Sequence, residues 1–191
     1  MSAPPRRPRI AVSGAAGTGK TTLAMALAEA LEVPYLAEGM RTRLEQGLDL
    51  HDLTRDSHRA LHFELLDEMS GAMNDAISAA GGFSCDRSPL DLAAFWLYYG
   101  FGFDEADTDA YVARTADAAR SLDCIVVMPL GAFAIEDDGV RTANRWVQTH
   151  YAAVLEHFLN HSDVPLLRLS PQSNGKQWLR EVIAHCGQVC R

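Results

Sequence analysis

Basic residues and long apolar runs are both limited in this sequence, and each shortage excludes a class of protein. The chain has 191 residues, a formal net charge of -8 and only two lysines. It contains no basic stripe of the kind that a polymeric nucleic-acid ligand usually requires. No apolar run approaches the roughly 20 residues that a membrane-spanning helix needs. A small anionic ligand is still allowed, because it needs only a local positive pocket.

Cysteine is also scarce, and its positions do not indicate a metal site. Two cysteines lie in apolar, strand-like segments, where we expect buried thiols, and two lie near the C-terminus beside His185: Cys85, Cys124, Cys186 and Cys190. A zinc site at the C-terminus would need a fourth ligand and tighter spacing. We therefore expect reduced cysteines at a helix end.

The first nine residues are rich in proline and arginine, and no apolar stretch long enough for a signal peptide follows them. We therefore expect residues 1–8 to form a disordered tail and the protein to be cytoplasmic. The remaining length fits one domain with a full core, so residues 9–191 are expected to form a single domain.

Short apolar runs alternate with helical patterns along the chain, which indicates an α/β fold with three layers and a mainly parallel, five-stranded sheet flanked by helices. The expected strands are residues 9–13, 33–37, 83–86, 123–128 and 164–169. The expected helices are residues 21–32, 41–47, 54–79, 88–100, 105–121, 145–160 and 173–186. Most of residues 130–144, which contain glycines and mixed charge, is expected to be a mobile loop.

The helix expected after residue 88 has a clear start signal. Ser88 can act as N-cap, Pro89 suits the first helical position, and Asp91 stands where a capping-box acid would be. Aromatic residues follow, of which one or two could stack on a ligand base, although aromatics at helical spacing usually belong to the core: Phe95, Trp96, Tyr98 and Tyr99.

Two pairs of histidines are spaced four residues apart, as zinc ligands on one helix can be. They are His58 with His62 and His157 with His161. Neither pair encloses the glutamate that a hydrolytic zinc site would place between its ligands. We therefore expect all four to be histidines on helix surfaces.

A glycine-rich segment lies between the first expected strand and helix and has the pattern Gly-x-x-x-x-Gly-Lys-Thr of a P-loop. Its glycines let the backbone turn N–H groups onto oxyanions, and the helix N-terminus adds partial positive charge. In this pattern Lys20 reaches the β- and γ-phosphates and Thr21 offers its hydroxyl to Mg²⁺. The sequence therefore predicts binding of ATP with Mg²⁺ by Gly14, Ala15, Ala16, Gly17, Thr18, Gly19, Lys20, Thr21 and Thr22.

The P-loop does not by itself distinguish a kinase from a GTPase or a motor ATPase. The sequence has no guanine-reading Asn-Lys-x-Asp segment, and its most strand-like segment is followed by Pro129, without the Asp-Glu of motor ATPases. Only the expected strand over residues 83–86 ends in an acid followed by a base, Asp86 and Arg87.

The segment Asp86-Arg87-Ser88-Pro89-Leu90-Asp91 resembles the Asp-Arg or Glu-Arg-Ser segment of thymidylate kinases and deoxynucleoside kinases. In those families it faces the transferred phosphoryl group. Thymidylate kinases usually have an aromatic residue where Ser88 stands, and deoxynucleoside kinases have a Glu-Pro pair where Glu38 is followed by Gly39. The resemblance therefore does not identify the molecule that accepts the phosphoryl group.

The segment Asp137-Asp138-Gly139-Val140-Arg141 is similar to the lid of the NadR-like family, which is related to nicotinamide riboside kinase domains. Glu38 and Arg41 likewise resemble the acid and arginine at the end of that family's second strand. These resemblances cover most of the chain. They imply a P-loop kinase fold with a lid and a cytoplasmic enzyme, in a group whose members are often homodimers.

These observations lead to the hypothesis of ATP-dependent phosphoryl transfer to a small nucleoside- or nucleotide-like acceptor, with Lys20 and Mg²⁺ neutralising charge. Asp86 would hold Mg²⁺ or accept the acceptor's proton, and Glu38 is the other candidate base. The candidate cations near the acceptor and in the lid are Arg87, Arg41, Arg141 and Arg145. The alternative is a regulatory P-loop ATPase, a nucleotide switch that acts on a protein partner.

Overall fold

A computed structural model of the chain describes residues 6–131 and 144–189. Its five strands pair in parallel in the order β2-β3-β1-β4-β5. The strands are β1 (Arg9–Ser13), β2 (Tyr35–Leu36), β3 (Phe83–Asp86), β4 (Cys124–Val127) and β5 (Leu166–Arg168). The five-stranded parallel sheet is confirmed, and β2 is shorter than the expected segment.

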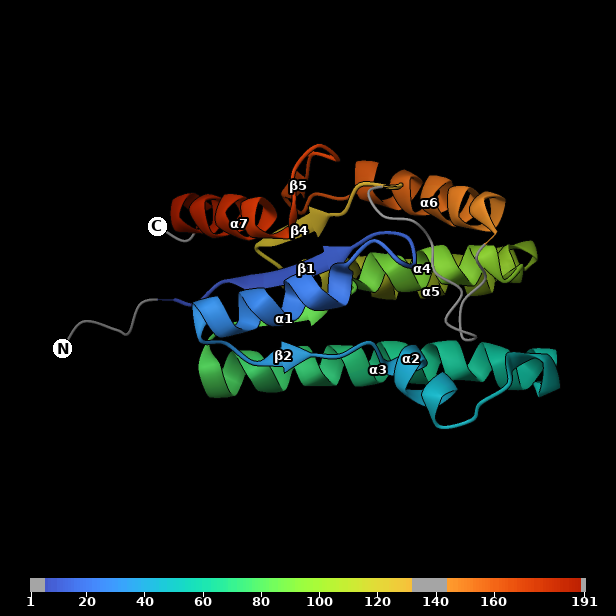
Figure 1. Cartoon of the computed structure of the whole chain (residues 1–191). Helices are drawn as coiled ribbons and strands as arrows, with labels where there is room; N and C mark the ends of the chain where they lie inside the picture. Colours follow the sequence, from blue (N-terminus) through green and yellow to red (C-terminus); the bar gives the residue numbers. More distant parts are fainter. Residues whose placement is uncertain (1–5, 132–143, 190–191) are drawn as a thin grey trace.

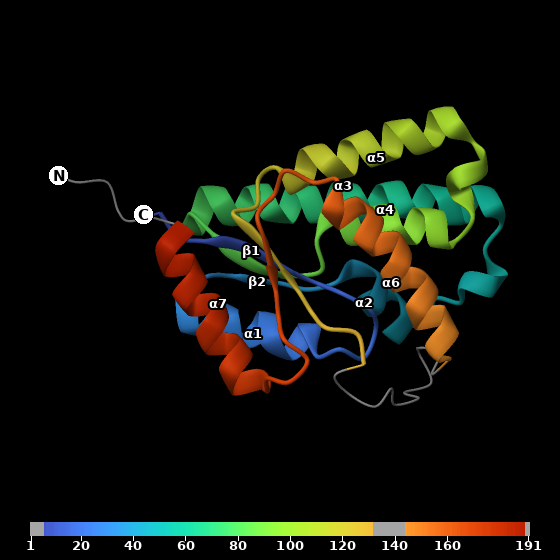
Figure 2. The ribbon, with the colours of Figure 1, turned by 90° about the horizontal axis from the view of Figure 1, so that it is seen from above.

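Helices cover both faces of this sheet, as Figures 1 and 2 show. Helices α1 (Lys20–Leu31) and α7 (Gly175–Val189) lie on one face. The other face is covered by α3 (Arg55–Ala80), α4 (Pro89–Tyr98), α5 (Glu105–Ala119) and α6 (Arg145–Asn160). The short α2 (Gly39–Glu45) follows β2, and two 3₁₀ turns lie at Leu50–Asp52 and Phe101–Phe103. The expected three-layer fold is confirmed.

The central strand β1 is buried on both faces, as a parallel strand between two helical layers must be. Ile10 and Val12 pack in the cluster with α1 and α7, and Ala11 between them packs in the opposite cluster. This alternation anchors β1 at the middle of the sheet. The chain leaves β1 at its carboxyl end, where the P-loop begins.

The turn from β3 into α4 is stabilised by the capping box that the sequence predicts. The Ser88 backbone N–H donates to Asp91 Oδ2 at 2.9 Å, and Pro89 is the first helical residue. Arg87 precedes the cap with a φ of 83°, a left-handed conformation that costs a non-glycine residue about 1–3 kcal/mol. The cap and the left-handed backbone conformation of Arg87 together direct its side chain inward at the end of β3.

The structure corrects the expectation that His62 lies on a helix surface. His62 is fully buried on α3 in an aromatic cluster with Trp96, Phe101 and Tyr111. Neither of its ring nitrogens has a hydrogen-bond partner among the described residues, and burial lowers its pKa to about 3. Helix α3 packs against both α4 and α5, and His62 lies on the side that these two helices cover. His157 and His161 are exposed, as expected.

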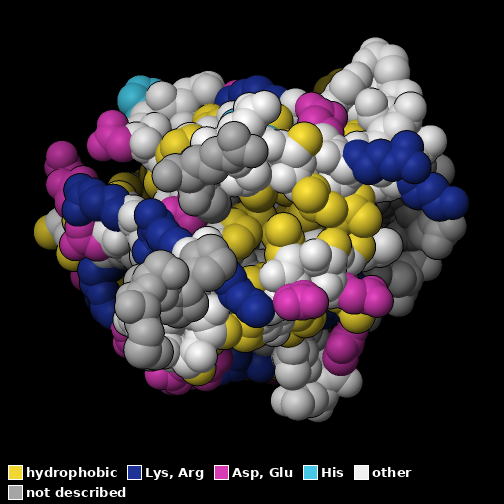
Figure 3. Space-filling view, turned by 90° about the vertical axis from the view of Figure 1, so that its left-hand side faces the viewer, with side chains coloured by type: hydrophobic (Ala, Val, Ile, Leu, Met, Phe, Trp, Pro, Cys, Tyr) yellow, Lys and Arg dark blue, Asp and Glu magenta, His cyan; other side chains and the backbone are white. Residues whose placement is uncertain are grey.

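The face at the amino ends of the strands lies opposite the P-loop. Figure 3 shows hydrophobic side chains gathered in the middle of this face, with charged side chains around them. Near this end, Asp123 pairs with Arg6 and Arg9, which ties the first described residues to the start of β4. No helix within residues 6–131 and 144–189 is long and apolar enough to cross a bilayer.

Candidate functional site

Three predicted site segments meet at the carboxyl edge of the sheet. The P-loop follows β1, Asp86 ends β3, and Glu38 comes two residues after β2. Because β3 lies between β1 and β2 in the sheet, these segments are neighbours in space. The carboxyl ends of strands in open parallel sheets are where such folds bind ligands.

The P-loop folds back on itself through its own lysine. Lys20 Nζ donates to the backbone carbonyl of Ala15 at 2.7 Å, and the Thr18 hydroxyl donates to the same carbonyl at 2.9 Å. Gly14 has a φ of 143°, and a Cβ there would lie 3.1 Å from the Cβ of Met128, which follows β4, so this close approach requires glycine. The loop is therefore tightly closed around the Ala15 carbonyl.

The Lys20 ammonium is almost inaccessible to solvent, which changes its acidity. Burial and the nearby positive charge of Arg87 lower its pKa to about 7, although Glu38, Asp91 and Asp86 act in the opposite direction. A phosphate group in the loop would favour the charged form, because opposite charges stabilise each other in a buried site. Binding of an anion in the loop would therefore raise the pKa of Lys20.

Thr21 and Asp86 lie together at the start of α1. The Thr21 hydroxyl donates to Asp86 Oδ2 at 2.5 Å. The other carboxylate oxygen, Oδ1, is buried and has no hydrogen-bond partner in the described part of the chain. A hydroxyl and a carboxylate with an unpartnered oxygen are ligands of the kind that Mg²⁺ prefers, so these two residues fit the predicted metal role.

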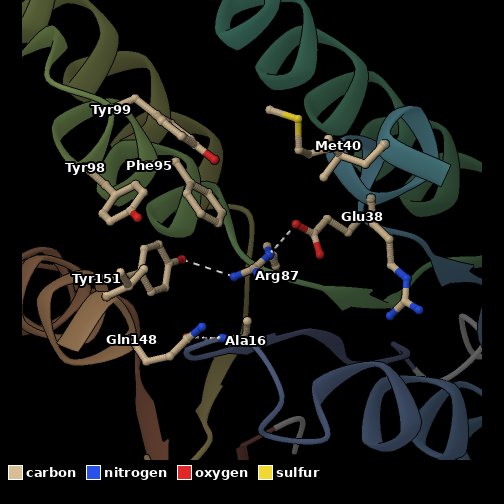
Figure 4. Close-up of a pocket in the computed structure, with 12 residues that line it drawn as sticks. Ala16, Glu38, Met40, Arg87, Phe95, Tyr98, Tyr99, Gln148 and Tyr151 are labelled. Carbon is tan, nitrogen blue, oxygen red and sulfur yellow. Dashed lines mark hydrogen bonds and ion pairs between the residues drawn. The ribbon is translucent and has the colours of Figure 1, made fainter. Parts of the chain in front are cut away.

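Arg87 lies between two acids and is buried with them, as Figure 4 shows for its pair with Glu38. Arg87 Nε is 2.6 Å from Glu38 Oε1, although not at the angle of a hydrogen bond, and Nη1 is 3.1 Å from Asp91 Oδ1. Its guanidinium also lies over the Phe95 ring and donates to the Tyr151 hydroxyl. Burial alone would lower the pKa of Arg87, but Glu38, Tyr151 and Asp91 raise it well above its ordinary value.

Asp91 joins the P-loop to the other elements of the site. Its carboxylate accepts from the hydroxyls of Ser13 at 2.5 Å, Ser88 at 2.8 Å and Tyr151 at 2.9 Å. The Gly14 N–H is 3.5 Å from Asp91 Oδ1. Burial would raise the pKa of Asp91, but Arg87 and these hydrogen bonds hold it below its usual value. Asp91 therefore remains a carboxylate inside the protein.

A cavity of about 150 Å³ opens beside this network. Figure 4 shows aromatic side chains of α4 on one side of it, Met40 on the opposite side, and Arg87 between them. Residues from the P-loop, α2, α4 and α6 line it: Ala16, Glu38, Met40, Arg41, Leu44, Arg87, Phe95, Tyr98, Tyr99, Val147, Gln148 and Tyr151. Trp96 is instead fully buried in the core. The cavity combines apolar walls with one buried ion pair.

The remaining predicted cations are less closely tied to this site. Arg41 lines the cavity, and its Nε donates to Glu45 Oε1 at 2.7 Å. Arg145 is exposed at the start of α6, with its guanidinium 4.9 Å from the centre of the Trp146 ring. Arg141 and the rest of the predicted lid, residues 137–141, lie outside the described residues.

Sequence reasoning did not find three members of the site. Asp91 was expected only as a helix cap, and Tyr151 and Gln148 only as residues of a helix. The four-residue spacing of Arg87 and Asp91 is a local signal for an ion pair, although Arg87 precedes α4 and has a φ of 83°, so the two residues do not lie on one helix. The α6 residues carry no such local signal, because their partners lie 60 or more positions away.

Comparison with known proteins gives a family match over most of the chain. Residues 9–176 match the model of a protein family described as an AAA domain. A curated relative is the bifunctional pantoate ligase/cytidylate kinase of Synechococcus sp. (strain JA-2-3B'a(2-13)), which is 39% identical over 70 residues. The match covers 34% of this chain and 13% of that protein, so the chain spans only a small part of its length.

Solved structures give a match of the whole fold. A deoxyadenosine kinase from M. mycoides, with the products dCMP and a flexible dCDP bound, has a TM-score of 0.66, 16% identity and coverage of 95% of this chain and 99% of that chain. A NadR protein in complex with NR has a TM-score of 0.72, 17% identity and coverage of 94% and 52%. These similarities confirm the P-loop kinase-like fold that the sequence resemblance implied.

Proposed function

The chain belongs to the AAA domain family matched over residues 9–176, and on this premise we propose that it transfers a phosphoryl group from ATP to a small nucleoside- or nucleotide-like acceptor. One observation carries the proposal. The P-loop and the aromatic cavity meet at Ala16, with the Glu38–Arg87 ion pair beside that junction. A phosphoryl donor and a flat acceptor would thus lie next to each other across charged groups.

On the donor side, the loop amides and Lys20 would bind the phosphates of ATP. Lys20 must leave the Ala15 carbonyl to reach them, and the positive charge it then carries offsets the charge of the moving group. Thr21 and Asp86 would hold Mg²⁺, which supplies further charge neutralisation on the phosphate oxygens when bound.

On the acceptor side, the two members of the ion pair would have different roles. Glu38 lines the cavity and can accept the proton of an attacking hydroxyl, a role typically worth about 10²–10⁴-fold in rate. Asp86 does not line the cavity, which favours Glu38 over Asp86 as the base. Arg87 would orient the acceptor and the transferred phosphoryl group, with Asp91 and Tyr151 holding the guanidinium in place.

The aromatic walls would hold a flat heterocycle. Phe95 and Tyr98 of α4, with Tyr99 at its C-cap, face Met40 across the cavity. The similar kinases are described with a deoxynucleotide product and with NR, which supports an acceptor of the nucleoside class. Arg41 would contact the acceptor, and Arg141 and Arg145 would bring positive charge to the transition state, a contribution of about 10³–10⁵-fold for such an arginine.

The test is ADP release with ATP and Mg²⁺ across a panel of nucleosides, nucleoside monophosphates and nicotinamide riboside, with Lys20→Ala as the control. We expect slow ATP hydrolysis alone and much faster ADP release with one acceptor class, lost in Lys20→Ala. If none of the acceptors speeds ADP release although ATP still binds, the kinase proposal is rejected for these acceptors. This result would instead favour a nucleotide switch that acts on a protein partner.

A further inference from the structure

Gln148 on α6 is hydrogen-bonded to the P-loop across 132 positions of the sequence. Its side-chain Oε1 accepts the backbone N–H of Ala16 at 3.0 Å, and Gln148 is only 5% exposed. Figure 4 shows this contact at the base of the cavity. Backbone N–H groups of a P-loop are the donors that bind phosphate oxygens. The Gln148 amide oxygen therefore accepts from a backbone N–H group of the type that donates to phosphate oxygens in a P-loop.

Ala16 is the P-loop residue that lines the proposed acceptor cavity. It lines that cavity together with Glu38 and Arg87, whereas Thr21 lies at the start of α1 beside Asp86. A phosphoryl group in transfer must lie between the loop and the acceptor. The terminal phosphate of a triphosphate is therefore the phosphate that would come nearest to the Ala16 amide.

We propose that Gln148 is a positioning residue that distinguishes a bound triphosphate from a bound diphosphate. Its amide oxygen occupies the Ala16 N–H until a terminal phosphate arrives, and then gives up that donor to the phosphate. This inference rests on the proposed function in one respect, namely that nucleotide phosphates bind the loop. The exchange is favourable because hydrogen bonds to ionised acceptors are roughly twice as strong as neutral ones.

Release of the Ala16 N–H by Gln148 would also change the shape of the acceptor cavity. Gln148 shares the cavity wall with Val147 and Tyr151 of the same helix, and Tyr151 is bonded to Arg87 and Asp91. When Gln148 releases Ala16, the wall that faces the acceptor changes. A diphosphate, which lacks the terminal group, leaves this wall as it is. Helix α6 thus links occupancy of the donor site to the shape of the acceptor site.

The test compares ADP with AMP-PNP, a triphosphate analogue, by titration calorimetry with Mg²⁺. In Gln148→Glu, we expect AMP-PNP affinity to fall at least tenfold, because a carboxylate at Ala16 repels the terminal phosphate. In Gln148→Leu, we expect AMP-PNP affinity to rise severalfold, because no internal acceptor has to be displaced. ADP affinity should change less than about threefold in both. Thr149→Ala, an exposed change on the same helix, should alter neither.

Each other outcome is decisive. Equal shifts for ADP and AMP-PNP, or no shift for either, would overturn this role of Gln148 while leaving the proposed function intact. Failure of the unsubstituted protein to bind either nucleotide would overturn both. If Gln148→Leu does not fold, Gln148→Asn serves the same purpose, because its shorter amide no longer reaches Ala16. Selective tightening of AMP-PNP by Gln148→Asn would support the inference, and its absence would reject it.

Discussion

Arg87 Nε lies 2.6 Å from Glu38 Oε1, and both side chains are at most 9% exposed. This ion pair joins the residue after β3 to the segment after β2, at the wall of the cavity. Removing one member of a buried pair typically costs about 3–5 kcal/mol, because the other charge is left uncompensated. The pair therefore contributes to the architecture of the site as well as to its proposed chemistry.

Glu38→Gln keeps the shape of the side chain and removes its basicity. We expect acceptor-dependent ADP release to fall by about 10²–10⁴-fold, the usual contribution of a general base, with little change in ADP affinity. Steady-state kinetics and titration calorimetry measure the two effects separately. Glu64→Gln, an exposed change on α3, is the control. Turnover within threefold of the unsubstituted protein would exclude Glu38 as the base.

Asp86→Asn tests the metal role of the Thr21–Asp86 pair. In the unsubstituted protein, ADP should bind more tightly with Mg²⁺ than with EDTA. The substitution should reduce the gain in ADP affinity that Mg²⁺ provides at least tenfold, because a neutral amide is a poorer ligand for the cation. Affinity without metal should stay the same or rise, since a negative charge near the phosphates is removed. Asp117→Asn, on the exposed end of α5, is the control, and an unchanged Mg²⁺ benefit contradicts the assignment.

The pKa of Lys20, about 7, predicts a pH dependence of nucleotide binding. Phosphates bind the charged form, so above pH 7 binding must take up one proton. ADP affinity should then fall by up to about tenfold for each pH unit above 7. Calorimetry in buffers of different ionisation enthalpy measures how many protons are taken up when ADP binds. Lys20→Met should bind more weakly and lack this proton uptake, and the same uptake in both proteins would assign it to another group.

The buried His62 predicts a loss of stability in acid. Its pKa is about 3 in the folded chain against 6.5 for an ordinary histidine, so the unfolded chain binds more protons between these values. Stability should therefore fall as pH drops below 6.5, by up to about 1.4 kcal/mol per pH unit from this group. Urea unfolding at pH 7.5 and pH 5 should show a smaller loss in His62→Leu than in the exposed control His157→Leu. Equal losses would contradict the prediction.

Local sequence signals predicted the parts of the site that depend on neighbouring residues. The P-loop and the capping box at Ser88 and Asp91 are set by spacings of a few residues, and both are where the sequence indicates. Strand β2 is shorter than expected, since Pro34 has no N–H to donate to a neighbouring strand and contributes only its carbonyl, which accepts from Ser84.

Long-range packing determined what the sequence did not predict. Trp96 and Tyr98 lie two positions apart on α4, and residues at that spacing point to different sides of a helix. Trp96 therefore reaches the core beside α5, whereas Tyr98 faces α6 and the cavity. No pattern within α4 reveals which helix will cover which side. The contact of Gln148 with Ala16 likewise arises only when α6 is docked against the P-loop.

Strand β1 has both of its neighbours far downstream, with β3 at Phe83–Asp86 and β4 at Cys124–Val127. During synthesis from the N-terminus, the strand that leads into the P-loop is therefore made long before either partner. Such non-local pairing makes folding slow and leaves strand edges unpaired in the meantime. A nascent chain that ends before β4 has emerged should be unable to retain a nucleotide. Nucleotide capture should therefore follow translation of β4, although the loop itself is translated before both strands that pair with β1.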